Sequence, residues 1–197
     1  MKPAVFLDRD GTLVEEVGYL DRLDRLSLFP WSIDAVRLLN RAGFAVVVVS
    51  NQAGVARGFF AEPFVLEVQR EIDALLAAAG GRIDGWYYCP HHPDAPLPQY
   101  RRACECRKPR PGMIRQAQAE LGVDASRSYV IGDRWLDVQL ARNVGARAIL
   151  VRTGYGATEE RQAPDGMAAD MVADNLIEAV SWVLRDSRAT RHGPESR

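Results

Sequence analysis

Acidic side chains at the end of a short apolar segment form the first group of residues that could do chemistry. Asp8 and Asp10 follow the apolar residues 4–7, and Gly11 comes directly after them. Two carboxylates this close repel each other unless a hard cation such as Mg²⁺ neutralises them or one is protonated. Gly11 lets the backbone turn, so both side chains can face one site. The pattern therefore predicts a Mg²⁺-dependent centre in which Asp8 attacks phosphorus and Asp10 transfers protons.

Two further apolar segments also end in polar residues that suit this chemistry. Ser50 closes a β-branched run, and Asp133 follows another apolar run, with Asp137 four residues later. Ligands of an open α/β sheet bind beyond the carboxyl ends of its strands, so these side chains should converge with the first two carboxylates. The alternative for the Asp-x-Asp motif is a turn and helix-cap pair, but polar residues at three segment ends favour the catalytic interpretation.

Lysine is rare in this chain, which makes its position informative. Only Lys2 and Lys108 are lysines among 25 basic residues. An ammonium group at position 108 and the hydroxyl of Ser50 would hold phosphoryl oxygens while charge moves during transfer. The expected catalytic residues are therefore Asp8, Asp10, Ser50 and Lys108.

The cysteines are concentrated in one segment, and two of the three histidines lie among them. All three cysteines fall between residues 89 and 106, and the pairs Cys-x-His and Cys-x-Cys each place two ligands on one side of an extended chain. Two such pairs suit a closed tetrahedral Zn²⁺ site, which we expect to be structural because no coordination position stays open. The predicted ligands are Cys89, His91, Cys104 and Cys106. His92 is the alternative histidine ligand, and a set of idle thiols is the alternative for the whole cluster.

The elements that must position these groups alternate between strands and helices. Short apolar runs predict strands at Ala4–Asp8, Ala45–Ser50, Ser128–Asp133 and Arg147–Arg152, with a weaker candidate at Ile83–Cys89. Helices are predicted at Trp31–Ala42, Glu62–Ala79, Pro111–Leu121, Trp135–Asn143 and Asn175–Leu184. This alternation predicts an α/β fold with a doubly wound parallel sheet.

The composition restricts the class of protein and its partners. The chain has 197 residues, with 25 basic and 26 acidic side chains and a net charge of −1. Such a balance gives no reason to expect nucleic acid or a membrane surface as the partner, so we expect a small molecule. Without a signal-peptide pattern or a long apolar run, the expected location is cytoplasmic. An odd number of cysteines also argues against a disulfide framework.

The length and pattern indicate one domain. We predict a single domain over residues 1–185 with a zinc loop at 89–106, followed by a polar, disordered tail at 186–197. His192 in that tail is expected to bind nothing. A small domain with a self-contained site is expected to be a monomer.

The motifs together resemble those of the haloacid dehalogenase superfamily of phosphatases. The resemblance rests on Asp8-Arg-Asp10-Gly-Thr, the Ser50 hydroxyl, Lys108 and Gly132-Asp133, and covers residues 4–180. It implies a Rossmann-like fold and an aspartyl-phosphate intermediate. It also implies Mg²⁺ held by Asp8, Asp133 and the main-chain carbonyl of Asp10, with Arg134 at the edge of the metal site.

Within that superfamily, the chain resembles phosphatases of sugar bisphosphates. The segments that carry this resemblance are Gly18-Tyr19, residues 50–58 and the cysteine-rich segment that ends in Arg107-Lys108. The resemblance implies that Lys108 contacts the transferring phosphoryl group and that Arg107 helps to recognise the substrate. The other substrate contacts that it implies are Glu16, Val17, Gly18, Tyr19, Asn51, Gln52 and Ala53.

The zinc loop also bears on the two alternative functions, a histidinol-phosphate phosphatase and a binding module without catalysis. The spacing leaves no room for a separate cap domain, so we expect an essentially capless core in which this loop helps to cover the site. Histidinol-phosphate phosphatases share the acidic motifs but resemble a form with a shorter loop, whereas 12 residues separate His91 from Cys104 here. A zinc-stabilised binding module without catalysis is the alternative of another class. Phosphate release that depends on Mg²⁺ would distinguish it from an enzyme.

Overall fold

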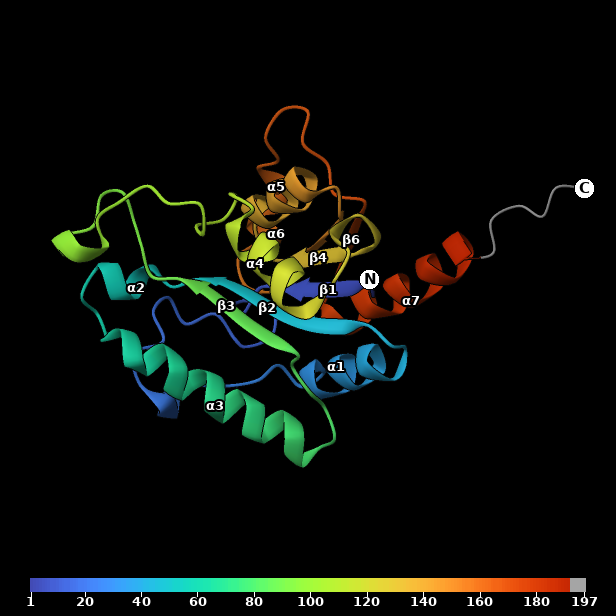
Figure 1. The fold of residues 1–197 in the computed structure, drawn as a ribbon, viewed down its shortest axis with the longest axis horizontal. Coiled ribbons are helices and arrows are strands. Elements are labelled where there is room, and N and C mark those ends of the chain that lie inside the picture. Colours follow the sequence, from blue (N-terminus) through green and yellow to red (C-terminus); the bar gives the residue numbers. More distant parts are fainter. Residues whose placement is uncertain (192–197) are drawn as a thin grey trace, which may run out of the picture.

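A parallel sheet of six strands forms the centre of the computed structural model, which describes residues 1–191 (Figure 1). Its spatial order is β3-β2-β1-β4-β5-β6, and every neighbouring pair is parallel. The strands are β1 (Ala4–Leu7), β2 (Ala45–Asn51), β3 (Gly85–Cys89), β4 (Tyr129–Gly132), β5 (Arg147–Val151) and β6 (Met171–Ala173). The direction of winding reverses at β1, so the crevice between β1 and β4 is the expected ligand site of such a sheet. The predicted α/β class and doubly wound sheet are confirmed.

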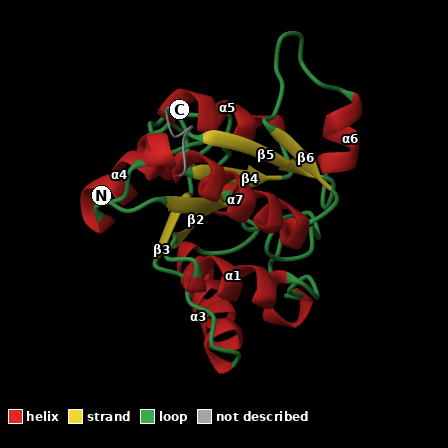
Figure 2. Cartoon of the chain, turned by 90° about the vertical axis from the view of Figure 1, so that its right-hand side faces the viewer, coloured by secondary structure: helices red, strands yellow, loops and turns green. Residues whose placement is uncertain are grey.

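Helices cover both faces of the sheet, as Figures 1 and 2 show. They are α1 (Ser32–Arg41), α2 (Ala53–Ala56), α3 (Glu62–Ala78), α4 (Gly112–Leu121), α5 (Trp135–Val144), α6 (Gly156–Arg161) and α7 (Leu176–Arg191). Alternate residues of each strand point to opposite faces. One apolar core accordingly joins Val5 and Leu7 of β1 to α1, α3 and α7. The other joins Ala4 and Phe6 to α4 and α5.

The strand register fixes where the polar residues leave the sheet. Leu7 of β1 lies beside Val48 of β2 and Ile131 of β4. The amide of Asp8 continues this register by donating a hydrogen bond to the carbonyl of Ile131 at 2.9 Å. Asp8, the end of β2 and the residue after β4 therefore meet at one edge of the sheet.

Three short elements were not predicted from the sequence, namely α2, α6 and β6. Each has three to six residues, which is too short for a periodic pattern to develop. The last helix, α7, also continues to Arg191 and so includes the first part of the segment predicted as a tail. Asp186 anchors this part, because it accepts hydrogen bonds from Tyr129 and Arg147. The rest of the predicted tail, with His192, lies outside the described residues.

The segment between β3 and α4 carries the cysteines and has little regular structure. Only Pro98–Tyr100 forms a short 3₁₀ turn within it. Figure 1 shows this segment extending beyond the sheet on the side of α2. The amide of Leu97 also donates to the carbonyl of Ala56, at the end of α2, at 3.4 Å. Among the helices of residues 1–191, none is long and apolar enough to cross a membrane.

Candidate active site

Three buried carboxylates meet at the carboxyl ends of β1 and β4. Asp8 follows β1, Asp133 follows β4 and Asp137 lies in the first turn of α5, and one oxygen of each lies within 4.8 Å of the others. Asp137 was expected near the other carboxylates from its spacing to Asp133, but neither a catalytic nor a metal-binding role was predicted for it. Three negative charges in a buried place need cations close by.

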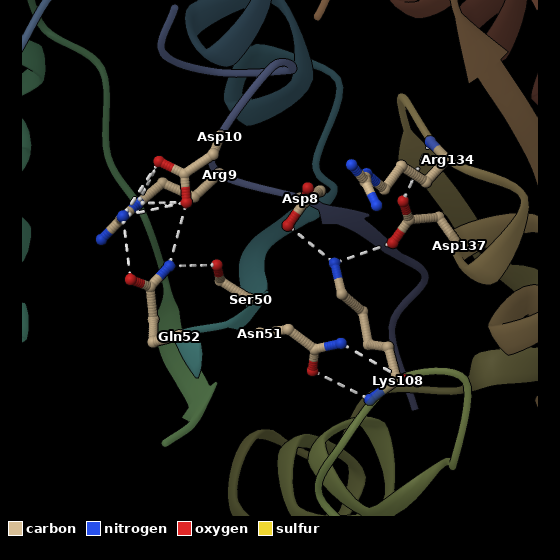
Figure 3. A network of polar contacts seen from close by, with 9 residues as sticks. All are labelled: Asp8, Arg9, Asp10, Ser50, Asn51, Gln52, Lys108, Arg134 and Asp137. Atoms are coloured by element: carbon tan, nitrogen blue, oxygen red, sulfur yellow. Dashed lines mark hydrogen bonds and ion pairs between the residues drawn. The ribbon is translucent and has the colours of Figure 1, made fainter. Parts of the chain in front are cut away.

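One cation, Lys108, lies between two of these carboxylates (Figure 3). Its Nζ is 2.6 Å from an oxygen of Asp8 and 2.7 Å from an oxygen of Asp137, and its side chain is 1% exposed. The two carboxylates raise the pKa of Lys108 despite its burial, so the lysine stays charged. One ammonium cannot balance three carboxylates, and negative charge remains in excess.

Burial and the excess of negative charge both raise the pKa values of two carboxyl groups in the cluster. Burial raises the pKa of Asp8 to about 7, although the charge of Lys108 opposes the shift. Burial, with the charges of Asp8 and Asp137, raises the pKa of Asp133 to about 8. A group of carboxylate oxygens that is short of positive charge fits a hard divalent cation such as Mg²⁺.

The carboxylate of Asp133 is held rigidly by the backbone around it. The amide of Tyr155 donates a hydrogen bond to its Oδ2 at 2.8 Å. Gly11 and Gly154 pack against the same oxygen, and a Cβ on either residue would lie 2.3 or 2.2 Å from it. Both glycines also have positive φ angles, of 79° and 56°. Any residue with a Cβ at either position would displace the carboxylate, so both positions require glycine.

The side chain of Asp10 lies apart from those of Asp8 and Asp137 and belongs to a second polar network (Figure 3). Arg9 donates to its carboxylate from Nε at 3.1 Å and from Nη2 at 2.9 Å. The amide nitrogen of Gln52 donates to the same carboxylate at 3.0 Å and to Ser50 Oγ at 2.7 Å. Asp10 is thereby oriented toward the hydroxyl of Ser50. No role was predicted for the buried Arg9, although its position between Asp8 and Asp10 was the available signal.

Asn51 lies between the two networks and holds the backbone of Lys108. Its Nδ2 donates to the carbonyl of Lys108 at 3.2 Å, and its Oδ1 accepts from the amide of Lys108 at 3.0 Å. Successive residues of an extended chain point to opposite sides. Ser50 and Gln52, the residue after β2, accordingly face Asp10, while Asn51 faces Lys108. Asn51, which was predicted as a substrate contact, lines the cavity, and its amide group also holds the main chain of Lys108.

A cavity of about 410 Å³ opens in front of these groups. The catalytic, substrate-binding and Mg²⁺-site residues predicted from the sequence that line it are Asp8, Asp10, Glu16, Gly18, Tyr19, Ser50, Asn51, Gln52, Ala53, Arg107, Lys108, Asp133 and Arg134. Val17 does not line the cavity and instead packs against the apolar core. Burial raises the pKa of Glu16, whose carboxylate accepts a hydrogen bond from the amide of Gly18 at 2.5 Å. The guanidinium of Arg134 lies 4.1 Å from the ring centre of Tyr155.

The cavity is also lined by residues that the sequence analysis did not assign to it. Arg9, Arg57, His92 and Tyr155 are the charged or polar examples. Burial and the neighbouring charges of Arg107 and Arg57 lower the pKa of His92.

The four predicted zinc ligands come together in the loop after β3. The three Sγ atoms are 3.2–3.4 Å apart, and His91 Nδ1 is 3.4 Å from Cys106 Sγ and 3.8 Å from Cys89 Sγ. No disulfide joins Cys89, Cys104 and Cys106. Three thiols and an imidazole nitrogen in one closed group suit Zn²⁺. Of the two adjacent histidines, His91 belongs to this group.

The loop is also tied to the start of α3. The carboxylate of Glu62 accepts hydrogen bonds from the hydroxyls of Tyr88 at 3.0 Å and Tyr100 at 2.8 Å. On the other side of the cluster, Arg107 and Lys108 directly follow Cys106. The cysteine and histidine cluster thus connects a surface loop to the buried lysine.

The fold and these side chains together define a haloacid dehalogenase-like hydrolase. A family model described as HAD-hydrolase-like matches residues 105–179. A D-glycero-beta-D-manno-heptose-1,7-bisphosphate 7-phosphatase from Yersinia pestis is 46% identical to the chain, over 89% of this chain and 92% of the relative. A protein of the same name from Escherichia coli K12 is 43% identical, over 94% and 96%. The chain belongs to the family of D-glycero-beta-D-manno-heptose-1,7-bisphosphate 7-phosphatases.

A solved structure supports the same assignment. The D,D-heptose 1,7-bisphosphate phosphatase from B. bronchiseptica, complexed with magnesium and phosphate, superposes with a TM-score of 0.82. It is 32% identical, and the match covers 94% of this chain and 99% of that structure. The predicted superfamily is confirmed, and the fold of the chain is that of its structural relatives.

Proposed function

We propose that this protein removes the C7 phosphate of D-glycero-β-D-manno-heptose 1,7-bisphosphate and releases the 1-phosphate. The observation that carries the proposal is the meeting of Asp8, Asp133 and Lys108 at the crevice between β1 and β4. The names of relatives up to 46% identical support the substrate and its β anomer. Heptose 1-phosphates are then intermediates for nucleotide-activated heptoses.

In the proposed reaction, a carboxylate oxygen of Asp8 forms a bond to the phosphorus of the C7 phosphate while the bond from phosphorus to the sugar oxygen breaks. Asp10 donates its proton to that leaving oxygen. Asp10 then takes a proton from water, whose oxygen attacks the phosphorus and releases inorganic phosphate and free Asp8. To reach the leaving oxygen, the Asp10 side chain must exchange contacts with Arg9 and Gln52 for contacts with the substrate.

Charge on the transferring phosphoryl group is balanced by side chains that already surround Asp8. Ser50 donates its hydroxyl, and Lys108 donates from Nζ after it releases the Asp8 oxygen. Asp8, Asp133 and the main-chain carbonyl of Asp10 would hold Mg²⁺, which supplies positive charge for the phosphoryl oxygens. Arg134 contributes from the rim of this site.

We further propose that Cys89, His91, Cys104 and Cys106 hold a structural Zn²⁺. The ion would fix the ends of an otherwise irregular loop and so set the positions of Arg107 and Lys108. All of these groups belong to one chain, so we propose that the monomer is active.

Phosphate release tests the proposal directly. The purified protein should release phosphate from the β-heptose bisphosphate only when Mg²⁺ is present, faster than from the α anomer or from histidinol phosphate. Asp8→Asn should abolish release, whereas Asp165→Asn, an exposed change outside the cavity, should not. A binding module without catalysis would release none, and a preference for histidinol phosphate would contradict the proposed substrate.

A further inference from the structure

The β5–α6 loop (residues 152–155) packs against the turn that follows β1. The hydroxyl of Thr153 donates a hydrogen bond to the main-chain carbonyl of Gly11 at 2.6 Å. Gly154 also lies against this turn, because a Cβ on it would be 2.6 Å from the Cα of Gly11. Thr153 and Gly11 are 142 positions apart in the chain, so their contact forms only when the sheet is complete.

The turn after β1 carries the main-chain carbonyl of Asp10, which is one of the proposed Mg²⁺ ligands. That carbonyl shares a planar peptide unit with the amide of Gly11. The amide donates a hydrogen bond to the carbonyl of Val14 at 2.8 Å, which holds one side of Gly11. Thr153 holds the carbonyl on the other side. Because glycine has no side chain to restrict its backbone, the direction of the Asp10 carbonyl depends on these two hydrogen bonds.

The same loop and the helix after it also hold the segment that follows β4. The amide of Tyr155 donates to Asp133 Oδ2 at 2.8 Å. The carboxylate of Glu159, in α6, accepts a hydrogen bond from the amide of Trp135 at 2.9 Å, at the start of α5. One stretch of chain therefore contacts both segments that supply the proposed metal ligands, and Thr153 makes its hydrogen bond to the first of them.

The backbone of the loop is itself held in place around Thr153. The amide of Arg152 donates to the carbonyl of Ala173 in β6 at 2.9 Å, and the carbonyl of Thr153 accepts from the amide of Gly156 at 2.8 Å. The guanidinium of Arg152 also pairs with Glu160 at 2.7 Å. The hydroxyl of Thr153 is thus presented to the turn after β1 from a fixed backbone, which lowers the entropic cost of its hydrogen bond.

We propose that Thr153 is a positioning residue of the Mg²⁺ site, which acts through the Gly11 carbonyl on the main-chain carbonyl of Asp10. The inference deepens the proposed function and rests on the Mg²⁺ site that belongs to it. Thr153 does not line the cavity, so its effect on the reaction passes through the backbone and not through contact with the substrate. Partners that orient metal ligands typically change metal affinity by about 10–100-fold when they are lost.

Titration of the substrate-free protein with Mg²⁺, followed by calorimetry, tests this role. Thr153→Val removes the hydroxyl but keeps the branched side chain, and it should weaken Mg²⁺ binding about tenfold or more. Thr153→Ala, which also lacks the hydroxyl, should show the same weakening, whereas Thr153→Ser should restore most of the affinity. Thr158→Val is the matched control, because it makes the same change at an exposed position of α6, and it should bind Mg²⁺ as the wild type does.

Two further measurements separate positioning from a general loss of structure. The Mg²⁺ concentration for half-maximal phosphate release should rise by the same factor as the dissociation constant, and saturating Mg²⁺ should recover most of kcat. Urea unfolding in EDTA measures the stability without Mg²⁺, which a merely structural role would lower. Variants without the hydroxyl that lose stability in EDTA but bind Mg²⁺ as tightly as Thr153→Ser would overturn the proposal.

The outcomes also separate this inference from the proposed function. If the wild type binds Mg²⁺ and releases phosphate from the heptose bisphosphate, but Thr153→Val binds Mg²⁺ equally well, the positioning role is wrong and the proposed function stands. If the wild type binds Mg²⁺ but releases no phosphate, the proposed function fails, while weakened binding by Thr153→Val still supports the positioning role. If the wild type binds no Mg²⁺, both are overturned.

Discussion

Replacing Lys108 by methionine should strongly destabilise the protein when Mg²⁺ is absent. The ammonium is in contact with Asp8 at 2.6 Å and Asp137 at 2.7 Å, and it is almost fully buried. Removing one partner of a buried ion pair costs about 3–5 kcal/mol of unfolding free energy, because the remaining charge has no compensation. Here the change leaves three carboxylates with no ammonium beside them, so we expect the upper part of that range.

The loss of stability caused by Lys108→Met should depend on pH. Asp8 and Asp133 have folded-state pKa values of about 7 and about 8, above the ordinary value of 3.8. The folded protein therefore binds more protons than the unfolded chain between about pH 4 and 8, and its stability falls as the pH rises through that window. Each carboxyl group that is protonated only in the folded protein adds up to about 1.4 kcal/mol to the free energy of unfolding for each pH unit of acidification. The charge of Lys108 lowers the pKa of both carboxyls, so its removal should raise these pKa values further. The variant then gains more stability on acidification than the wild type, and part of the loss at pH 8 should be recovered at pH 5.

Urea unfolding of wild type and Lys108→Met at pH 8 and pH 5, each with EDTA and with Mg²⁺, measures these effects. Mg²⁺ should raise the stability of the variant at pH 8, since a cation again balances the carboxylates. A variant within 1 kcal/mol of wild type at pH 8 in EDTA would refute the argument. So would a loss that is equal at both pH values.

Three further changes test how the groups are held in place. Cys106→Ser should release the metal of the cysteine cluster and lower turnover through misplacement of Lys108, measured by metal analysis and phosphate release, and full activity without metal would contradict it. Asn51→Ala should lower kcat about tenfold or more through the freed backbone of Lys108 while the metal stays bound, and an unchanged kcat would exclude this role. Gly154→Ala should weaken Mg²⁺ binding, measured as the Mg²⁺ concentration for half-maximal rate, because its Cβ would lie 2.2 Å from Asp133 Oδ2.

The central parts of the fold and site could be predicted because parallel sheets follow simple rules. Apolar runs of four to seven residues marked five of the six strands, and the carboxyl ends of such strands share one edge. That rule alone brings Asp8, Ser50 and Asp133 together. The zinc ligands followed from their own spacing, since residues two apart in an extended chain face one way.

The remaining residues depend on contacts that no local pattern encodes. Arg57 follows a helix of one turn, and His92 lies in an irregular loop, so neither has a periodicity that would point it at the cavity. Val17 was assigned with its neighbours along the chain, but its side chain turns to the core. Asn51 meets a backbone 57 residues away, and that pairing exists only once the loop has closed.

The position of β1 in the sheet has a consequence for the assembly of the site. This strand is made first during synthesis, yet its partners are β2 and β4, and β4 begins at residue 129. Asp8 therefore remains without Asp133 until β4 has been made, which is after the loop that carries Lys108. Phosphatase activity consequently reports on completion of the central sheet rather than on early collapse, and recovery of activity during refolding would time its closure.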